Sequence, residues 1–264
     1  MIIDAHVHIF PEKIAHAAVE KLAGISGIAP CTDGTLAGTR ELMKKSGIDR
    51  AVLLNIATKP TQLHGVNTSA IEINRDKELY PLGSIHYAAP DWREYLIMLK
   101  EAGIRGIKLH PDYQGFMINS PQLKDIYAAC QEMDIFIVFH AGWDCYSPEL
   151  VHATPSASAL VAREFPRLKM VLAHMGALRM EDEVLKHLVG LDNVYFDTAM
   201  AATYMDREKV KMIIDKHGYE RIFFGSDCPW EDPVDTLNFI DGLRLKGHQR
   251  EAILSQNVLE LFNK

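Results

Sequence analysis

Cysteine is scarce in this sequence, and the marks of a secreted chain are missing. Among 264 residues there are four cysteines, and no two of them form a CxxC pair. A chain of this length can bury about three quarters of the surface it exposes when unfolded, so it needs no disulfides to fold. The N-terminal residues show no charged segment followed by a cleavage site. We therefore expect free thiols and a cytoplasmic protein.

Long apolar runs and an excess of basic residues are also missing. The strictly apolar stretches, such as residues 135–139, are far shorter than the ~20 residues of a membrane-spanning helix. Lysine and arginine number 28 against 35 aspartates and glutamates, which gives a net charge of −7. Binding to phosphate backbones needs a dense basic surface. The composition argues against a membrane and against nucleic acid as partners. It leaves a small-molecule substrate, with a homodimer as an option.

Eight short apolar runs recur along the chain, and their starts are 24 to 49 residues apart. Each run is rich in valine, isoleucine, leucine and phenylalanine with little polar alternation. This pattern is typical of strands that are buried on both faces of a parallel sheet. The runs span residues 2–8, 51–56, 81–86, 105–110, 135–140, 169–174, 193–197 and 222–227.

Helix-like segments separate these runs. In residues 91–102 the apolar positions have helical spacing, Asp91 suits the N-cap and Gly103 ends the segment. Similar segments span 121–133, 155–165, 181–188, 206–217 and 233–242. Eight strand–helix units predict an α/β fold, a (β/α)8 TIM barrel formed as a single domain by residues 1–264, with an open doubly wound sheet as the alternative. We expect an irregular loop over 24–38 and one or two closing helices over 246–262.

Titratable side chains gather where the predicted strands end: His6, His8, His86, His110, His140, His174 and Asp227. In a barrel, the C-terminal ends of the strands meet on the face that carries the active site. Side chains alternate along a strand, so His6 and His8 point the same way and can bind one metal ion. Asp4 shares their face and can orient one of them.

Motifs of this kind follow one another along the whole chain. They are Asp4-Ala-His-Val-His8, Gly106-Ile-Lys-Leu-His110-Pro, Phe139-His-Ala-Gly142, Leu172-Ala-His-Met-Gly176, Phe224-Gly-Ser-Asp-Cys-Pro-Trp230 and Asn257-Val-Leu-Glu-Leu-Phe262. In order and spacing they resemble the amidohydrolase superfamily, in particular its amidohydrolase-related (amidohydrolase 2) family of metal-dependent hydrolases and decarboxylases with a TIM barrel.

The resemblance implies a role for five of these residues. His6, His8 and His140 match metal ligands, and Asp227 matches an aspartate that binds the metal or its water and shuttles a proton. His174 matches a histidine that is either a ligand of a second metal or an electrophile near the substrate.

The donor set agrees with a divalent metal. Three neutral imidazoles and a carboxylate suit Zn²⁺ with an open position for water, whose pKa the metal lowers towards about 7. Mn, Fe and Ni remain alternatives, because imidazole and carboxylate suit these ions too. We expect one tightly held metal per chain, Asp227 as the proton acceptor and His174 as the group that polarises the substrate.

Lys108 departs from the simplest pattern, because a lysine that points into a barrel needs a partner. Some members of the superfamily carboxylate a lysine on this strand to bridge two metals. Alternatively, Lys108 orients a substrate carboxylate or pairs with a buried acid. His110, which shares its strand face, and His86 are expected to contact the substrate or else to bond the backbone at their strand ends.

Several other residues are weaker candidates. Asp197 suits a hydrogen bond to a metal ligand or a contact with the substrate, and Arg179 suits an anionic substrate or solvent. Cys228 fits packing better than a nucleophile, since no separate base is identifiable for it. Trp143 and Trp230 suit a pocket wall. The histidines expected at the surface are His16, His152, His187, His217 and His248.

Two activities fit these residues, and a third hypothesis lies outside catalysis. The first is hydrolysis of a C–O, C–N or activated C–C bond in a small, carboxylate-bearing organic molecule by a metal-activated water. The alternative is non-oxidative decarboxylation of an aromatic or unsaturated acid. A barrel that only binds metal or ligand would normally have lost a proton-transfer group, whereas Asp227 and His174 are both present. The sequence therefore favours a metal-dependent hydrolase.

Overall fold

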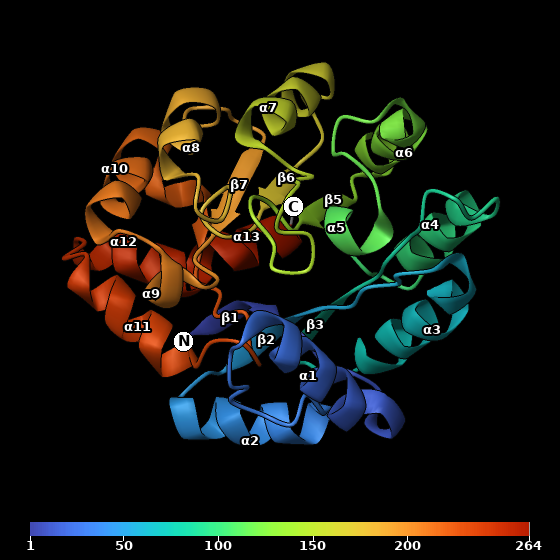
Figure 1. Cartoon of the computed structure of the whole chain (residues 1–264), viewed down its shortest axis with the longest axis horizontal. Helices are drawn as coiled ribbons and strands as arrows, with labels where there is room; N and C mark the ends of the chain where they lie inside the picture. Colours follow the sequence, from blue (N-terminus) through green and yellow to red (C-terminus); the bar gives the residue numbers. More distant parts are fainter. Residues whose placement is uncertain (264) are drawn as a thin grey trace.

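Eight parallel strands ringed by helices form the computed structural model, which describes residues 1–263 (Figure 1). Each strand overlaps one of the eight apolar runs, and the predicted (β/α)8 barrel is confirmed. The strands are β1 (Ile3–Val7), β2 (Arg50–Leu54), β3 (Leu79–Leu82), β4 (Gly106–Leu109), β5 (Phe136–Phe139), β6 (Met170–Leu172), β7 (Val194–Asp197) and β8 (Ile222–Phe223).

Hydrogen bonds close these strands into a ring. Strands β1 to β3 pair in sequence order in one sheet, and β4 to β8 pair in sequence order in another. Between β3 and β4, the Lys108 N–H donates to the Gly83 carbonyl over 2.8 Å. Between β8 and β1, the Asp227 N–H donates to the His6 carbonyl over 2.9 Å. These two seams rule out the open doubly wound sheet.

Helices surround the ring, and most of them connect one strand to the next. They are α1 (Glu12–Ser26), α2 (Leu36–Ser46), α3 (Leu63–Ile73), α4 (Trp92–Glu101), α5 (Pro111–Gln114), α6 (Lys124–Met133), α7 (Pro155–Glu164), α8 (Glu181–His187), α9 (Ala201–Tyr204), α10 (Arg207–His217), α11 (Pro233–Gly242), α12 (Gly247–Glu251) and α13 (Asn257–Asn263). Short 3-10 turns span Pro60–Gln62, Pro121–Leu123 and Tyr219–Arg221, and a π-helical turn spans Ala252–Gln256.

The segment between β1 and β2 differs from the prediction. The irregular loop expected over 24–38 is shorter, because α1 runs to Ser26 and α2 begins at Leu36. Gly27 ends α1 in the left-handed conformation, and the Thr35 hydroxyl accepts the Gly38 N–H at the start of α2. Asp91 does lie at the N-cap position of α4, but its side chain makes no capping hydrogen bond.

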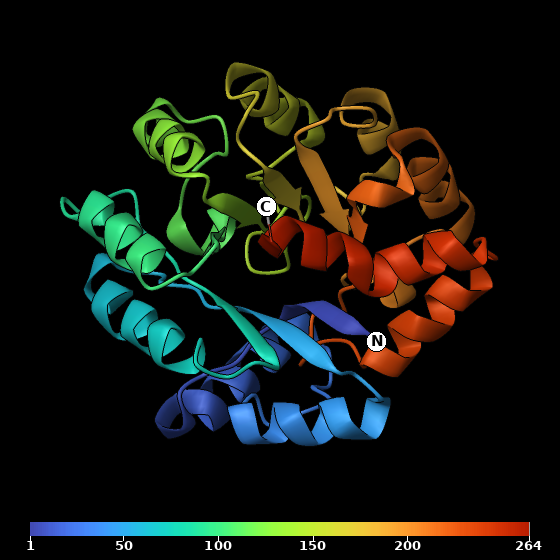
Figure 2. The same ribbon diagram turned by 180° about the vertical axis from the view of Figure 1, so that it is seen from behind.

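The barrel interior is closed at its N-terminal end by the last helix. Val258 and Leu261 of α13 pack against inward side chains of the strands, including Ala5, Val52 and Phe223. Figure 2 shows α13 lying across this end of the ring. Apolar side chains fill this N-terminal end of the barrel. The polar residues at the C-terminal ends of the strands therefore lie on the opposite face, where the loops that follow the strands begin.

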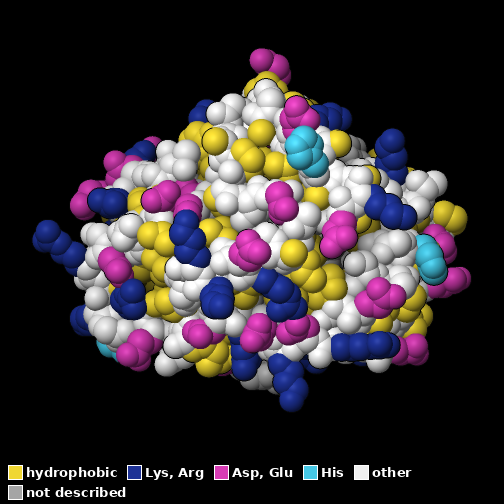
Figure 3. Space-filling view, turned by 90° about the horizontal axis from the view of Figure 1, so that it is seen from below, with side chains coloured by type: hydrophobic (Ala, Val, Ile, Leu, Met, Phe, Trp, Pro, Cys, Tyr) yellow, Lys and Arg dark blue, Asp and Glu magenta, His cyan; other side chains and the backbone are white. Residues whose placement is uncertain are grey.

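Outside the barrel, the surface is mixed in charge. Figure 3 shows acidic and basic side chains interspersed on one side of the molecule. Within residues 1–263, no helix combines the length and the apolarity that crossing a membrane requires.

Candidate metal centre

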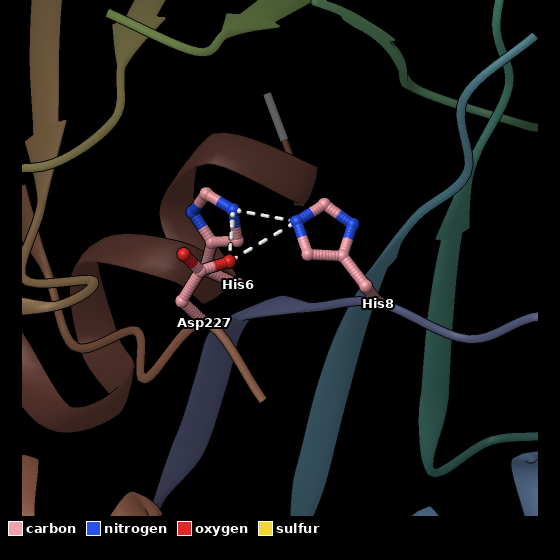
Figure 4. A group of neighbouring side chains, drawn as sticks. All are labelled: His6, His8 and Asp227. Carbon is pink, nitrogen blue, oxygen red and sulfur yellow. Dashed lines mark hydrogen bonds and ion pairs between the residues drawn. The ribbon is translucent and has the colours of Figure 1, made fainter. Parts of the chain in front are cut away.

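Three ligand-type side chains meet at the seam between β1 and β8 (Figure 4). The Nε2 atoms of His6 and His8 are 3.1 Å apart. The Asp227 Oδ1 lies 3.2 Å from His6 Nε2 and 3.1 Å from His8 Nε2. His6 lies on β1, His8 directly follows it, and Asp227 lies beyond β8, so barrel closure brings the two ends of the chain together at one point.

The hydrogen bonds behind the two imidazoles fix where their protons are. His6 Nδ1 lies 2.8 Å from Asp197 Oδ2, and His8 Nδ1 lies 3.0 Å from the Leu54 carbonyl oxygen. Carboxylate and carbonyl oxygens only accept, so both Nδ1 atoms carry the proton when the rings are neutral. Both Nε2 atoms then present lone pairs to each other and to the Asp227 carboxylate. Three acceptors at this separation require either a proton or a metal cation between them, and the donor set fits a divalent metal.

The electrostatics of this group also favour a positive charge. Burial opposes the protonation of His6, but the Asp197 and Asp227 carboxylates outweigh it and raise the pKa of His6 to about 9. Burial likewise works to raise the pKa of Asp227, but His6 and His8 hold that pKa well below its usual range. Asp227 is therefore ionised at neutral pH, and the group attracts either a proton or a metal ion.

The loops that carry these groups are held in unusual backbone conformations. Asp227 has a φ of 77°, and His174, after β6, has a φ of 59°. Residues other than glycine rarely adopt this left-handed region, at a cost on the order of 1–3 kcal/mol each. Such strain persists only where the surrounding structure imposes it, and both residues are among the titratable side chains that converge here.

His140 and His174 form a neighbouring pair. His174 Nε2 lies 3.0 Å from His140 Nδ1, and His174 Nδ1 lies 3.1 Å from the Ala199 carbonyl oxygen. The other ring nitrogen of His140, Nε2, lies 3.3 Å from Asp144 Oδ2. The ligand atoms of His140, Asp144 and His110 lie within 4.8 Å of one another and make a second group. His140 thus stands outside the first group of three, and its role as a ligand there remains a prediction.

Asp144 is absent from the residues that the sequence singled out. It follows β5 in a loop and has no place in a strand pattern, so periodicity does not reach it. The available signal was its spacing of four residues from His140, with both side chains buried in the structure. The loop is anchored locally, because Asp144 Oδ1 accepts the Tyr146 N–H over 2.6 Å.

Lys108 lies on β4 with its side chain fully buried. Within the described residues its Nζ has no hydrogen-bond partner, and no carboxylate lies within ion-pair distance of it. Burial lowers the pKa of Lys108 to about 8, against the opposing effect of Asp197, Asp227 and Asp144. Of the three alternatives for Lys108, a direct ion pair with a buried acid is therefore not observed.

The other two predicted substrate contacts lie in stacked aromatic surroundings. The His110 ring stacks on Tyr113, with centroids 3.7 Å apart, and on His140, at 4.4 Å. The His86 ring stacks on Tyr87, and its Nδ1 accepts the Ala88 N–H over 3.2 Å. His86 therefore makes the backbone bond that was its alternative role, and its contact with substrate remains a prediction.

The weaker candidates are also placed by the structure. The Arg179 guanidinium carbon lies 4.1 Å from the centre of the Trp143 ring and 4.6 Å from that of Tyr204. Cys228 is buried, with its sulfur 4.0 Å from that of Cys31, in keeping with a packing role. Trp230 is half-buried and packs against the core.

Two expectations about polar residues were wrong. Among residues 1–263, Asp4 makes no hydrogen bond to an imidazole: its carboxylate accepts the Ser226 hydroxyl over 2.6 Å and the His6 backbone N–H over 3.1 Å. The carboxylate that orients the His6 ring is that of Asp197. His217 is not at the surface but 1% exposed, between α10 and β7.

A TIM barrel with imidazoles and a carboxylate converging at its strand ends defines a class of metal-dependent enzymes. The chain belongs to the amidohydrolase family, because residues 3–264 match the family model described as amidohydrolase. The resemblance drawn from the motifs is thereby confirmed, and the family points to a metal-dependent enzyme of the amidohydrolase superfamily. Among proteins with curated functions, none matches this chain.

Solved structures with the same fold cover nearly the whole chain. An uncharacterized TIM-barrel protein from Bordetella bronchiseptica has a TM-score of 0.81 at 18% identity, over 100% of this chain and 99% of that one. A 5-carboxyvanillate decarboxylase from Sphingomonas paucimobilis has a TM-score of 0.71 at 13% identity, over 99% and 98%. A dihydroxybenzoic acid decarboxylase from Polaromonas with bound manganese has a TM-score of 0.71 at 16% identity, over 99% and 96%.

Proposed function

We propose that this protein is a metal-dependent, non-oxidative decarboxylase of an aromatic or unsaturated carboxylic acid. The observation that carries the proposal is the pairing of two features: three lone pairs that meet at one point, and a buried Lys108 amine that has no hydrogen-bond partner among the described residues. The first would hold a cation and the second would hold an anion. The similar structures described as decarboxylases support this activity better than they support the hydrolysis that the sequence favoured.

The residues proposed to hold the metal are His6, His8 and Asp227, with His140 as the fourth ligand. A divalent cation bound there would supply Lewis-acid chemistry, by drawing electron density from the substrate oxygens and from the bond to be broken. Zinc fits the imidazole-rich donor set, and manganese fits the carboxylate and is present in the Polaromonas enzyme.

Lys108 and Asp227 are proposed to act on the substrate itself. The Lys108 ammonium group would orient the substrate carboxylate for loss as CO2. Asp227, which is ionised, would accept the proton of a substrate hydroxyl group. When the C–C bond breaks, its electron pair remains on the ring carbon, and Asp227 returns the proton to that carbon. The substrate oxygen then regains a proton from solvent, so the overall change is carboxylate plus one solvent proton to CO2 and the decarboxylated, hydroxyl-bearing ring.

Hydrolysis is the second candidate, and Asp227 is the observation that favours it. An ionised carboxylate beside two imidazole lone pairs suits a general base that takes a proton from water. The substrate in that case would be a small carboxylate-bearing ester, lactone or amide.

One assay separates the two candidates. The purified protein is loaded with Mn²⁺ or Zn²⁺ and incubated with hydroxybenzoates, lactones and amides, while CO2 and acid release are measured. Decarboxylation predicts CO2 in equal amount with the decarboxylated ring. Acid release without CO2 would replace the proposal by the hydrolase, and neither product would favour a barrel that binds without catalysis.

We also propose a cellular location and a binding partner. All four cysteines are free in the structure, which suits a reducing compartment such as the cytoplasm. A small-molecule substrate is the partner proposed, and self-association into a homodimer remains open to measurement by sedimentation.

A further inference from the structure

Two of the four cysteines lie in contact with each other beside the metal centre, and the proposed reaction uses neither of them. The Sγ atoms of Cys31 and Cys228 are 4.0 Å apart. Cys31 lies in the irregular segment between α1 and α2, and Cys228 directly follows Asp227 after β8. The contact therefore joins a connecting segment near the start of the chain to the loop that carries a proposed metal ligand.

Main-chain hydrogen bonds hold these two segments side by side. The Cys31 N–H donates to the Pro229 carbonyl over 2.8 Å. On the other side, the Cys228 carbonyl accepts the His8 N–H over 2.7 Å, and the Cys228 N–H donates to the Ser226 hydroxyl over 3.0 Å. Because the backbones themselves are joined, the two thiols stay near each other whichever rotamers their side chains adopt.

The two thiols differ in how solvent reaches them. Cys228 is only 2% exposed, whereas Cys31 is half-buried and its thiol donates to the Glu231 carbonyl over 3.6 Å. The hydrogen bond with Cys31 and burial raise the pKa of the Cys228 thiol. An oxidant that arrives from solvent therefore meets Cys31 first, and Cys228 is placed to react second.

We infer that Cys31 and Cys228 form a peroxide-sensitive pair, and that the disulfide between them weakens metal binding. Hydrogen peroxide oxidises the Cys31 sulfur to a sulfenic acid and is itself reduced to water. The Cys228 sulfur then bonds to the Cys31 sulfur, and the hydroxyl group leaves as water with the Cys228 proton. In total, two thiols and one peroxide give one disulfide and two waters. In a reducing compartment such a disulfide is transient, because thiol reductants reverse it.

The effect on the metal centre follows from the position of Cys228. A disulfide bond is about 2.0 Å long, so the two sulfurs must approach each other by roughly 2 Å. Cys228 is bonded to Asp227, whose Oδ1 lies 3.2 Å from His6 Nε2 and 3.1 Å from His8 Nε2. A shift of Cys228 towards Cys31 therefore displaces a carboxylate that must stay aligned with both imidazoles. The disulfide does not depend on the proposed function, whereas its effect on metal binding rests on the proposed metal centre.

Thiol counting and peptide mapping test the disulfide without reference to activity. Protein stripped of metal with a chelator is treated with hydrogen peroxide, and its free thiols are counted after denaturation. We expect the count to fall from four to two and to recover with dithiothreitol. Trypsin digestion without reductant should yield the peptide 22–40 cross-linked to the peptide 222–244.

Titration with Zn²⁺ by calorimetry, after desalting, tests the effect on the metal centre. The oxidised wild type is expected to bind zinc at least roughly 10-fold more weakly than the reduced protein, as when a group that positions a ligand is lost. Cys31→Ser cannot form the disulfide, so peroxide should leave its zinc affinity unchanged. Circular dichroism of each variant establishes that it is folded.

Cys145→Ser is the matched control. Cys145 is half-buried like Cys31, and among residues 1–263 no other thiol lies in hydrogen-bond contact with it. This variant should still give the cross-linked peptides and the weaker zinc binding after peroxide treatment.

Three results would overturn the inference. Cys31 that gains oxygen atoms without cross-linking, or a disulfide that involves Cys130 or Cys145, would refute the pair. Equal zinc affinity in oxidised and reduced wild type would refute its effect on the centre. Failure of the proposed function has a separate measure, which is the absence of CO2 from the reduced, metal-loaded protein.

Discussion

The proton on each histidine of the centre is set by the residue behind it, and this decides what the site binds. Asp197 accepts from His6 through one carboxylate oxygen and from the backbone N–H groups of His174 and Ala199 through the other. One side chain of β7 therefore orients a residue of β1 and shapes the loop after β6. Asp197 therefore orients the His6 ring through Nδ1, on the side of the ring away from the metal site, and is not itself a proposed ligand.

Replacement of this carboxylate should weaken metal binding without removing a ligand. In Asp197→Asn, one of the two accepting oxygens becomes an NH2 group, which cannot accept a hydrogen bond. Either the His6 ring N–H or the backbone N–H groups of His174 and Ala199 then lose their acceptor. We expect metal affinity to fall by roughly 10- to 100-fold, the usual effect of losing the group behind a ligand. Calorimetric titration with Zn²⁺ measures it. Asp192→Asn, at an exposed position, is the control, and equal affinity in the two variants would contradict the role of Asp197.

Asp227 is expected to bind the metal and to transfer the proton, and an amide separates these two roles. Asp227→Asn retains an oxygen that can coordinate a metal but cannot accept a proton. Turnover should fall by more than about 100-fold, the low end of a general acid–base contribution. His174→Asn should keep the metal and also lose turnover. The measurements are metal content and kcat on the substrate found in the CO2 assay, and a near-native kcat in Asp227→Asn would exclude the proton-transfer role.

For the individual residues of the site, the sequence revealed the residue types but not all of their contacts. Strand alternation correctly placed His6 and His8 on one side. It also placed Asp4 there, yet Asp4 turns to Ser226 across the β1–β8 seam, a neighbour that no pattern within β1 identifies. Asp144 lies in a loop, where side-chain direction depends on local turns rather than on periodicity.

Among the elements, strands were predicted more reliably than connections. Each strand carries a run of apolar residues because both of its faces are buried, and this signal is local. Helix α1 was not predicted; only Ala15 and Val19 are buried along its 15 residues. Helices with a deeper buried face, such as α6 and α10, were predicted within a few residues of their observed ends.

The contact between α10 and β7 depends on a neutral histidine. His217 Nδ1 accepts the Gly190 N–H over 3.1 Å, and its Nε2–H donates to the Val194 carbonyl over 3.0 Å. Burial lowers the pKa of His217 to about 4, from the usual 6.5. A second proton would leave Nδ1 unable to accept, so the hydrogen bond from Gly190 requires the neutral ring.

This shift predicts a pH dependence of stability. The unfolded chain binds the proton at His217 with a pKa near 6.5, and the folded chain only near 4. The stability contributed by the neutral ring is therefore complete above pH 6.5 and is lost as the pH falls towards 4, by up to about 3 kcal/mol. In His217→Gln, which does not titrate, the free energy of unfolding from urea melts should change less over this window. Parallel curves for the two proteins would contradict the prediction.

For the whole molecule, closure of the barrel is what creates the site. His6 and His8 come from the first strand and Asp227 follows the last, so these ligands are separated by most of the chain and adjacent only across the β1–β8 seam. Two conditions specify this arrangement: eight repeated units and apolar packing by α13 at the opposite end. Sequence reasoning found the units. The exact pairing across the seam, and which loops turn inward, depend on tertiary contacts that no single segment encodes.

Because the ligands lie on both sides of this seam, metal binding should stabilise the entire barrel. A ligand that binds only the folded state at 100 times its dissociation constant adds about 2.7 kcal/mol. For a domain of this size that corresponds to a rise in melting temperature of roughly 5–10 °C. Calorimetric melts of chelator-treated protein, with and without added Zn²⁺, measure the rise. His8→Ala, which lacks one ligand at the seam, should lose at least half of it, whereas the exposed control His16→Ala should keep it in full. An equal rise in both variants would show that zinc stabilises the protein from some place other than the seam.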